Sequence, residues 1–216
     1  MLKLEKVCYR YKNGDRNVLK GISANFEPGK LHSIVGPSGT GKTTLLSIMA
    51  GLCTPTEGKI YIDDEDLAKI DLNIYRREKI TMIFQQFHLF PLLTTLENVS
   101  YLLEAKGVKR KAAEKRAGEL LNIVGIDESK HRRYPANISG GEQQRVAIAR
   151  SLSTGAKVIL ADEPTGNLDT ANSDAIVNIL QKLAHDELYC VIVVTHNPAI
   201  ADLSDVVLRM SDGMFV

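Results

Sequence analysis

Residues 36–43 have the types and spacing of a phosphate-binding loop, reading Gly-Pro-Ser-Gly-Thr-Gly-Lys-Thr. They follow an apolar, strand-like run at 31–35 and lead into a predicted helix at 42–49. Glycines let backbone N–H groups turn toward an anion, and the helix adds the positive end of its dipole. A lysine supplies a point charge and a threonine hydroxyl suits Mg²⁺. The alternative, a glycine-rich turn without a ligand, is disfavoured by the order strand, loop, helix. The segment therefore predicts binding of a nucleoside triphosphate, with contacts from Gly36, Ser38, Gly39, Gly41, Lys42, Thr43 and Thr44.

Two neighbouring carboxylates, Asp162 and Glu163, follow an apolar run at 158–161. This places them at the C-terminal edge of a predicted buried strand, where α/β proteins bind ligands. Asp162 suits a magnesium site shared with Thr43, and Glu163 suits polarisation of an attacking water. The alternative is a solvated acidic pair that opens a turn before Pro164. The phosphate loop favours the catalytic interpretation.

A second segment, Ser139-Gly140-Gly141-Glu142, precedes a predicted helix at 142–153. Ser-x-x-Glu is the pattern of a capping box, in which the two side chains satisfy exposed backbone donors. Two successive glycines at a helix start also leave N–H groups accessible to an anion. We therefore expect both a cap and a second phosphate-facing surface.

The elements that must position these residues form an α/β pattern. Predicted strands lie at 2–9, 31–35, 59–63, 79–84, 158–162, 190–195 and 206–210. Those at 158–161 and 190–194 are apolar without alternation, which is typical of parallel strands covered on both faces. Apolar residues recur at helical spacing in 95–106 and 109–124. We expect one domain over 1–216, with a core at about 1–85 and 157–216 and a helical lobe inserted at about 86–156.

Charge and composition limit the classes of partner and the cellular location that we expect. The 27 basic residues nearly balance the 26 acidic ones, so we expect no nucleic acid partner. No apolar stretch approaches the roughly 20 residues that span a bilayer, and the N-terminus lacks a signal-peptide pattern. Cys8, Cys53 and Cys190 have no metal-site spacing, so we expect reduced packing residues. These features predict a chain that stays in the cytoplasm.

With these motifs together, the chain resembles the ABC ATPases, the nucleotide-binding subunits of ATP-binding cassette transporters. The resemblance extends over nearly the whole chain. Residues 138–145 resemble the family signature, with Ile138 where leucine is usual and Glu142 where glutamine is usual. The segments at 84–87, 91–94 and 161–169 are most similar to bacterial subunits for lipoprotein release, macrolide or peptide export and cell division.

The resemblance also assigns single residues. Tyr11 resembles the aromatic residue that stacks on adenine, with Tyr9 as a rival. Gln85 resembles the glutamine that reaches magnesium and water and links to the membrane subunit, although Gln86 is adjacent. His196 resembles the histidine that contacts the γ-phosphate. Asp169 resembles part of the loop between subunits, or else caps the next helix. The other histidines, structural or exposed, are His32, His88, His131 and His185.

The resemblance implies a P-loop NTPase of the ABC ATPase type, a mixed β core with an inserted helical lobe. It implies hydrolysis of ATP with Mg²⁺ by Glu163, His196 and Gln85. Two cassettes, identical or different, would dimerise head to tail, so that each nucleotide also meets Ser139, Gly140, Gly141 and Glu142 of the other chain. Closure would drive separate integral membrane permease subunits from the cytoplasmic side of the membrane, for export or extraction of a substrate.

Other functions remain open at this stage. An ATP-driven mechanical regulator of a non-transporting membrane protein would share every motif. A cassette protein acting on nucleic acid or ribosomes is disfavoured by the single cassette and the lack of basic excess. A small-molecule kinase would leave residues 138–142 and His196 without a role. At Glu142, repulsion of a nearby triphosphate opposes the capping contact, and we expect repulsion to dominate.

Overall fold

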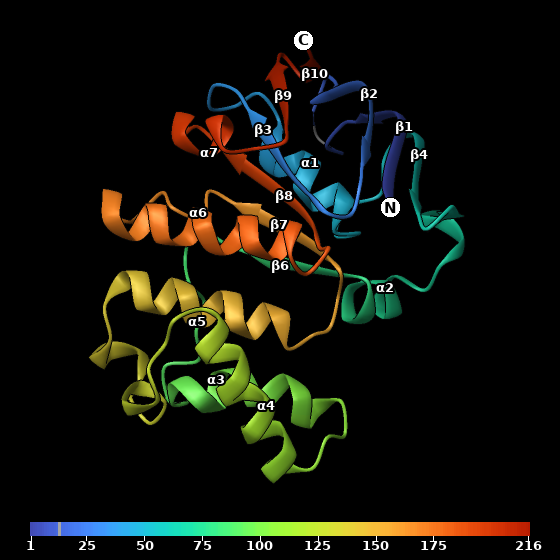
Figure 1. The fold of residues 1–216 in the computed structure, drawn as a ribbon. Helices are drawn as coiled ribbons and strands as arrows, with labels where there is room; N and C mark the ends of the chain where they lie inside the picture. Colours follow the sequence, from blue (N-terminus) through green and yellow to red (C-terminus); the bar gives the residue numbers. More distant parts are fainter. Residues whose placement is uncertain (13) are drawn as a thin grey trace.

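Two β-sheets, one mainly parallel and one antiparallel, form one half of the molecule (Figure 1). The computed structural model describes residues 1–12 and 14–216. The larger sheet has the order β10-β9-β3-β8-β7-β6 and is parallel apart from β10. The smaller sheet, β2-β1-β4-β5, is antiparallel. The strands of the larger sheet are β3 (Lys30–Val35), β6 (Ile80–Ile83), β7 (Val158–Asp162), β8 (Cys190–Thr195), β9 (Val206–Ser211) and β10 (Met214–Phe215). Those of the smaller sheet are β1 (Leu2–Tyr9), β2 (Leu19–Phe26), β4 (Glu57–Ile62) and β5 (Glu65–Asp66).

Helices cover both faces of the parallel sheet. Figure 1 shows α1 between the two sheets and α6 on the opposite side, next to α5. The helices are α1 (Lys42–Met49), α2 (Leu72–Glu78), α3 (Thr95–Ala105), α4 (Arg110–Ile123), α5 (Gly140–Leu152), α6 (Thr170–His185) and α7 (Pro198–Asp202). Short 3₁₀ turns lie at Leu67–Lys69, Glu128–Lys130 and Pro135–Asn137. This mixed α/β architecture is the predicted fold class.

The parallel strands contribute to two separate apolar cores. In β8, Ile192 and Val194 pack with α1 and the antiparallel sheet, whereas Val191 and Val193 pack with α4, α5 and α6. Every residue of β8 is buried. Successive side chains of a strand point to opposite faces, so a strand covered on both faces has no polar side. The lack of alternation at 190–194 therefore predicted this environment correctly.

Between β6 and β7 the regular elements of the structure are all helical. In this segment α3, α4 and α5 pack against one another, and α5 also contacts β6 and α6. Figure 1 places α3 and α4 at the end of the molecule away from the antiparallel sheet. The segment leaves the sheet directly after β6, at the edge where the acidic pair lies, and returns to the opposite edge, where β7 begins.

Several elements were not predicted from the sequence, namely β2, α2, the short helix α7 and the two-residue strands β5 and β10. In β2 the buried residues Leu19, Ile22 and Phe26 are spaced by three and four, because its pairing with β1 shifts register twice. Such bulges break the alternation on which strand prediction depends. In α2 only Tyr75 is fully packed, so its apolar period is too short to recognise. Helix α5 begins at Gly140, earlier than predicted, because Ser139 is its cap.

No helix within residues 1–12 and 14–216 is long and apolar enough to cross a membrane.

Candidate active site

The loop between β3 and α1 wraps around the ammonium group of Lys42. The Lys42 Nζ donates to the carbonyl oxygens of Gly36 at 2.7 Å and Pro37 at 2.8 Å, and the side chain is buried. Gly41 precedes α1 with φ of 102°, and an added Cβ would lie 3.1 Å from the Val18 carbonyl oxygen. Only glycine fits this backbone. With no acidic residue in its first turn, α1 presents its N–H groups to an anion.

Asp162 lies opposite the start of α1, at the end of β7. The Thr43 hydroxyl donates to Asp162 Oδ1 at 3.4 Å. Burial raises the pKa of Asp162, and the neighbouring Glu163 acts in the same direction, while Thr43 and Lys42 oppose them. A hydroxyl and a carboxylate side by side are the hard oxygen donors that Mg²⁺ prefers. The donor set therefore fits a magnesium ion.

Glu163 is held in an unusual conformation directly after β7. Its φ of 48° lies in the left-handed region, which costs a residue with a Cβ on the order of 1–3 kcal/mol. The carboxylate accepts from His196 Nδ1 at 2.8 Å and from the Thr195 hydroxyl and the His196 N–H at 3.4 Å. Its own N–H donates to the Val194 carbonyl oxygen at 2.9 Å. The end of β8 thus fixes the carboxylate that follows β7.

The Gln85 side chain is hydrogen-bonded to the segment that follows Glu163. Its Nε2 donates to Asn167 Oδ1, and the Asn167 Nδ2 donates back to the Gln85 carbonyl oxygen, both at 3.3 Å. The Gln85 side chain also lines the same cleft as Lys42 and Asp162. The loop after β6 and the loop after β7 therefore meet at this residue.

A cleft of about 410 Å³ joins most of the predicted site residues. Its lining includes Ser38, Gly39, Gly41, Lys42, Thr43, Thr44, Gln85, Asp162, Glu163 and His196. A second cavity of about 400 Å³ shares Glu163 and His196 and extends over Leu168 toward α6. The predicted site residues that line neither the cleft nor the second cavity are Gly36, Tyr11, Ser139, Gly140, Gly141, Glu142 and Asp169.

Tyr11 lies near the cleft from the side of the antiparallel sheet. Its hydroxyl and the Thr44 hydroxyl are 3.0 Å apart, and half of its surface is exposed. The rings of Tyr9 and Tyr11 meet edge to face, with centroids 5.0 Å apart. Of the two, Tyr11 is the more exposed, which favours Tyr11 for stacking.

The segment 139–142 starts α5 with the predicted capping box. Ser139 Oγ accepts from the Glu142 N–H at 3.3 Å, and Glu142 Oε2 accepts from the Ser139 N–H at 2.8 Å. Glu142 Oε1 forms an ion pair with Lys130. This cationic partner was not anticipated from the sequence, and the expected balance between repulsion and capping stays a prediction.

Asp169 caps α6, accepting from the Asn172 N–H at 2.8 Å. The capping alternative is therefore realised. Asp169 also binds the Asn172 Nδ2, at 2.9 Å, and Asn172 lies directly against Gly141, where an added Cβ would fall 2.1 Å from its Oδ1. Only glycine at 141 allows this approach. Asp169 is thus connected to the segment 139–142 within one chain.

Sequence reasoning missed two side chains of α5 that hold the loops of the cleft. Gln144 is fully buried, and its Nε2 donates to the carbonyl oxygens of Pro164 at 2.9 Å and Phe84 at 3.3 Å. Arg150 donates to the carbonyl oxygens of His88 at 2.7 Å and Phe87 at 3.1 Å. Both act on backbone far away in sequence, so no local pattern marks them.

The remaining cysteines and histidines lie apart from this chemistry. The cysteines are free, and Cys190 is buried in the core. The ring of His32 lies against the Glu27 backbone, His131 against the Ile126 carbonyl oxygen, and His185 against Asp205. No group of three or more metal-ligating His, Cys, Asp or Glu side chains occurs in the described part of the chain.

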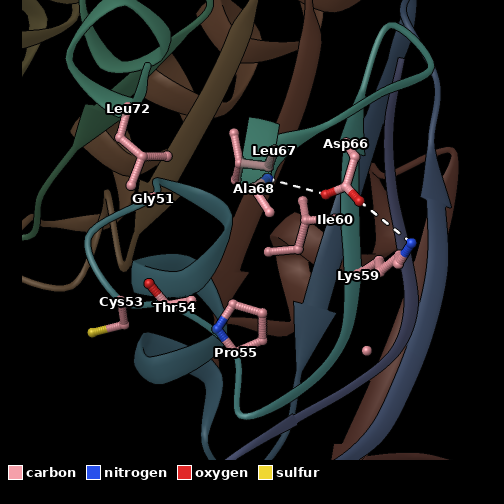
Figure 2. A pocket seen from close by; sticks show the side chains of 11 residues that line it. Gly51, Cys53, Thr54, Pro55, Lys59, Ile60, Asp66, Leu67, Ala68 and Leu72 are labelled. Atoms are coloured by element: carbon pink, nitrogen blue, oxygen red, sulfur yellow. Dashed lines mark hydrogen bonds and ion pairs between the residues drawn. The ribbon is translucent and has the colours of Figure 1, made fainter. Parts of the chain in front are cut away.

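A separate apolar cavity of about 270 Å³ lies beside β4, and Figure 2 shows its walls. Leu67, Leu72 and Ile60 line it. Its single carboxylate, Asp66, already accepts from the Ala68 N–H at 3.0 Å and pairs with Lys59 at 3.5 Å (Figure 2). Its one carboxylate and Lys59 are already paired with each other and its walls are mainly apolar, so this cavity is a weaker candidate phosphate site than the cleft at Lys42.

Comparison with known proteins gives a consistent result. A family model described as ABC transporter matches residues 19–166. YclH, an ABC transporter ATP-binding protein of Bacillus subtilis, is 44% identical over 215 residues, covering 100% of this chain and 95% of YclH. MacB of Shigella flexneri, a macrolide export ATP-binding/permease protein, is 42% identical over all of this chain, which spans 34% of MacB.

Solved structures agree with these relatives. The dimeric structure of MJ0796, described as a bacterial ABC transporter cassette, has a TM-score of 0.89 and 41% identity, covering 100% of this chain and 96% of that one. A second MJ0796 dimer, described as a post-hydrolysis state bound to ADP and Pi, has a TM-score of 0.89 and 40% identity. The resemblance to the macrolide-export and lipoprotein-release group is supported. The chain therefore belongs to the ABC transporter family, as an ATP-binding cassette that hydrolyses ATP.

Proposed function

We propose that the chain dimerises around two ATP molecules and drives conformational change in separate membrane subunits, for export or extraction of a substrate. The observation behind this proposal is a separation within the chain. Lys42, Asp162 and Glu163 share one cleft, whereas Ser139 is exposed at the start of α5 and lines no part of it. A second chain that approaches head to tail would bring the two surfaces onto one nucleotide, and the related MJ0796 cassettes are described as dimeric.

In this proposal, different groups of the chain bind the nucleotide, activate water and hold Mg²⁺. The loop around Lys42 binds the triphosphate, and Tyr11 stacks on the base. Glu163, held by Thr195 and His196, polarises the attacking water or takes up its proton. His196 contacts the γ-phosphate. Positioning and charge neutralisation supply most of the rate in phosphoryl transfer. Thr43, Asp162 and Gln85 would hold Mg²⁺, which neutralises charge on the phosphate oxygens.

We place the membrane subunit on the face around Gln85. Phe84, Phe90 and Leu92, all in the stretch between β6 and α3, are exposed, with Leu92 86% accessible. Large apolar side chains exposed close together in the chain favour an interaction surface. Leu52 and Phe84 also line a shallow hollow of about 220 Å³. The face includes the loops at Gln85 and at the start of α3. We also divide the chain into a core (about 1–85 and 157–216) and a helical lobe (about 86–156). Both would act on the cytoplasmic side of the membrane.

The name of MacB favours export over the alternative, a mechanical regulator of a membrane protein that transports nothing. Both would share the ATP chemistry and the docking face. Affinity capture of the tagged chain from detergent-solubilised membranes, followed by identification of the bound membrane protein, separates them. Recovery of a permease supports export, and recovery of a membrane protein without a transport pathway supports regulation.

Mixing two inactive variants tests the shared active sites. Ser139→Arg chains block the approach of the partner's nucleotide, and Lys42→Ala chains lose phosphate binding. A mixed dimer combines both defects in one site and leaves the other site with an intact loop and an intact Ser139. In an equal mixture, we expect up to about a quarter of normal ATPase activity, since half of the dimers are mixed and each has one good site. Activity that stays first order in a proven monomer would refute the composite site.

A further inference from the structure

The carboxylate of Glu142 uses its two oxygens for two different partners. Oε2 accepts from the Ser139 N–H at 2.8 Å and completes the capping box of α5. Oε1 is bound by the ammonium group of Lys130. The pair is partly shielded, with 13% of the Glu142 side chain and 33% of the Lys130 side chain exposed. Lys130 is the main reason why the pKa of Glu142 lies below its usual value.

The helix cap alone does not require a lysine, as α3 demonstrates. There, Glu97 Oε2 accepts from the Thr94 N–H at 2.8 Å and from the Thr94 hydroxyl at 2.7 Å, which forms the same type of capping box. In the described part of the chain, no Lys or Arg forms a salt bridge with Glu97. The pairing of Glu142 with Lys130 therefore serves a purpose other than capping.

The backbone that follows Lys130 is hydrogen-bonded to the start of α3. It ends a 3₁₀ turn that Asp127 caps by accepting from the Ser129 N–H at 2.9 Å. Immediately after this turn, the His131 carbonyl oxygen accepts from the Leu96 N–H at 2.9 Å. The Arg133 carbonyl oxygen accepts from the N–H of Thr95 at 2.8 Å and from its hydroxyl at 2.9 Å. Lys130 thus connects the start of α3 to the start of α5.

We propose that Lys130 is a positioning residue for the segment 139–142: it neutralises Glu142 and holds that carboxylate away from the partner chain's nucleotide. The inference rests on the proposed composite site. The positive end of the α5 dipole attracts an anion, whereas an unpaired carboxylate at this end would repel a triphosphate. With Lys130 in place the pair is neutral, and the field of the helix start remains available to the nucleotide.

The two residues depend on each other. A glutamine at 142 has a single acceptor oxygen, so keeping the bond from the Ser139 N–H would turn its NH₂ group toward the Lys130 ammonium. Conversely, loss of the lysine would leave Glu142 unpaired beside the incoming triphosphate. Either single change should therefore weaken ATP-dependent dimerisation, and the two changes together should compensate.

Sedimentation velocity with ATP, in a Glu163→Gln background that retains bound ATP, tests this. We expect Lys130→Met to weaken dimerisation about three- to tenfold, the range of one partly buried charge contact. Glu142→Gln alone should weaken it as well. The Lys130→Met/Glu142→Gln double variant should return to within about twofold of the parent, and Lys130→Arg should stay close to the parent.

Matched measurements separate positioning from folding. ATP affinity of the monomer and the thermal unfolding midpoint should be the same for Lys130→Met and for the control Arg116→Met, which removes a surface pair on α4 with Glu119. Should Lys130→Met fail to fold, Lys130→Gln takes its place with the same expectations. Dimerisation of Lys130→Met equal to the parent, or a double variant as weak as the sum of the singles, would overturn the role of Lys130. A parent that never dimerises would overturn the composite site as well.

Discussion

Replacing Gln144 by methionine tests whether α5 controls the two loops that meet at the cleft. Methionine keeps the length of the side chain but cannot donate to the carbonyl oxygens of Pro164 and Phe84, now bound at 2.9 and 3.3 Å. Pro164 directly follows Glu163, and Phe84 directly precedes Gln85. The change therefore acts on the position of two proposed site residues without touching either.

The expected loss of stability follows from these contacts. Each carbonyl left unpaired in the interior costs about 1–3 kcal/mol. Part of this is offset, because Gln144 Oε1 is itself buried with no partner among the described residues, and methionine removes it. The net loss is about 1–3 kcal/mol, or roughly 3–10 °C in the unfolding midpoint for a chain of this size.

Calorimetry and steady-state ATPase assays measure the two effects. We expect kcat to fall about tenfold or more, since small displacements of reacting groups are costly, while KM for ATP changes little. Gln143→Met is the matched control, because this neighbour makes one side-chain bond, to the Ile138 carbonyl oxygen at 3.3 Å, away from both loops. A Gln144→Met midpoint within about 1 °C of the parent, together with an unchanged kcat, would refute the reasoning.

Two further predictions concern single groups. Glu163→Gln should lower kcat by about 10²- to 10⁴-fold while retaining ATP affinity and trapping a dimer in sedimentation, because the amide keeps the shape but cannot act as a base; rapid turnover would remove Glu163 from this role. Burial raises the pKa of Cys190 to about 12, so its thiol should stay protonated and unreactive in native protein at pH 8. Iodoacetamide followed by mass spectrometry should modify half-buried Cys8 and Cys53 first, and Cys190 only after unfolding; early modification of Cys190 would contradict its place in the core.

Local patterns predicted the centre of the parallel sheet well, because β7 and β8 are buried along nearly their whole length. The strand at 190–195 is apolar on both faces, and α3 and α4 bury one side at helical spacing. The edge strand β2 escaped prediction because its bulges place Leu19, Ile22 and Phe26 at a helix-like spacing. Where pairing with a neighbouring strand introduces bulges, the spacing of apolar residues in the sequence no longer indicates the type of element.

The cleft at Lys42 could be anticipated for a related reason. Its residues follow strand ends, and parallel strands bring their C-terminal ends to one edge, so Asp162 and His196 had to converge. The contacts of Gln144 and Lys130 obey no such rule. They join α5 to carbonyl oxygens and to a turn whose positions depend on how the helices pack, and that packing is decided by the whole core.

These unpredicted contacts give α5 a place in communication between the two surfaces of the chain. From its first turn, Glu142 binds Lys130, whose turn is fixed to α3. From its middle, Gln144 reaches the loops at Glu163 and Gln85, and from its end Arg150 binds the backbone at 87–88. A displacement of the face around Gln85 must therefore either move α5 or break these bonds. Because α5 is a continuous helix of 13 residues, eight of them buried, moving it as a unit is less costly than breaking these bonds. In the proposed complex, the start of α5 would then follow the face around Gln85, so that the state of the membrane subunit would reach the surface proposed to receive the partner's nucleotide.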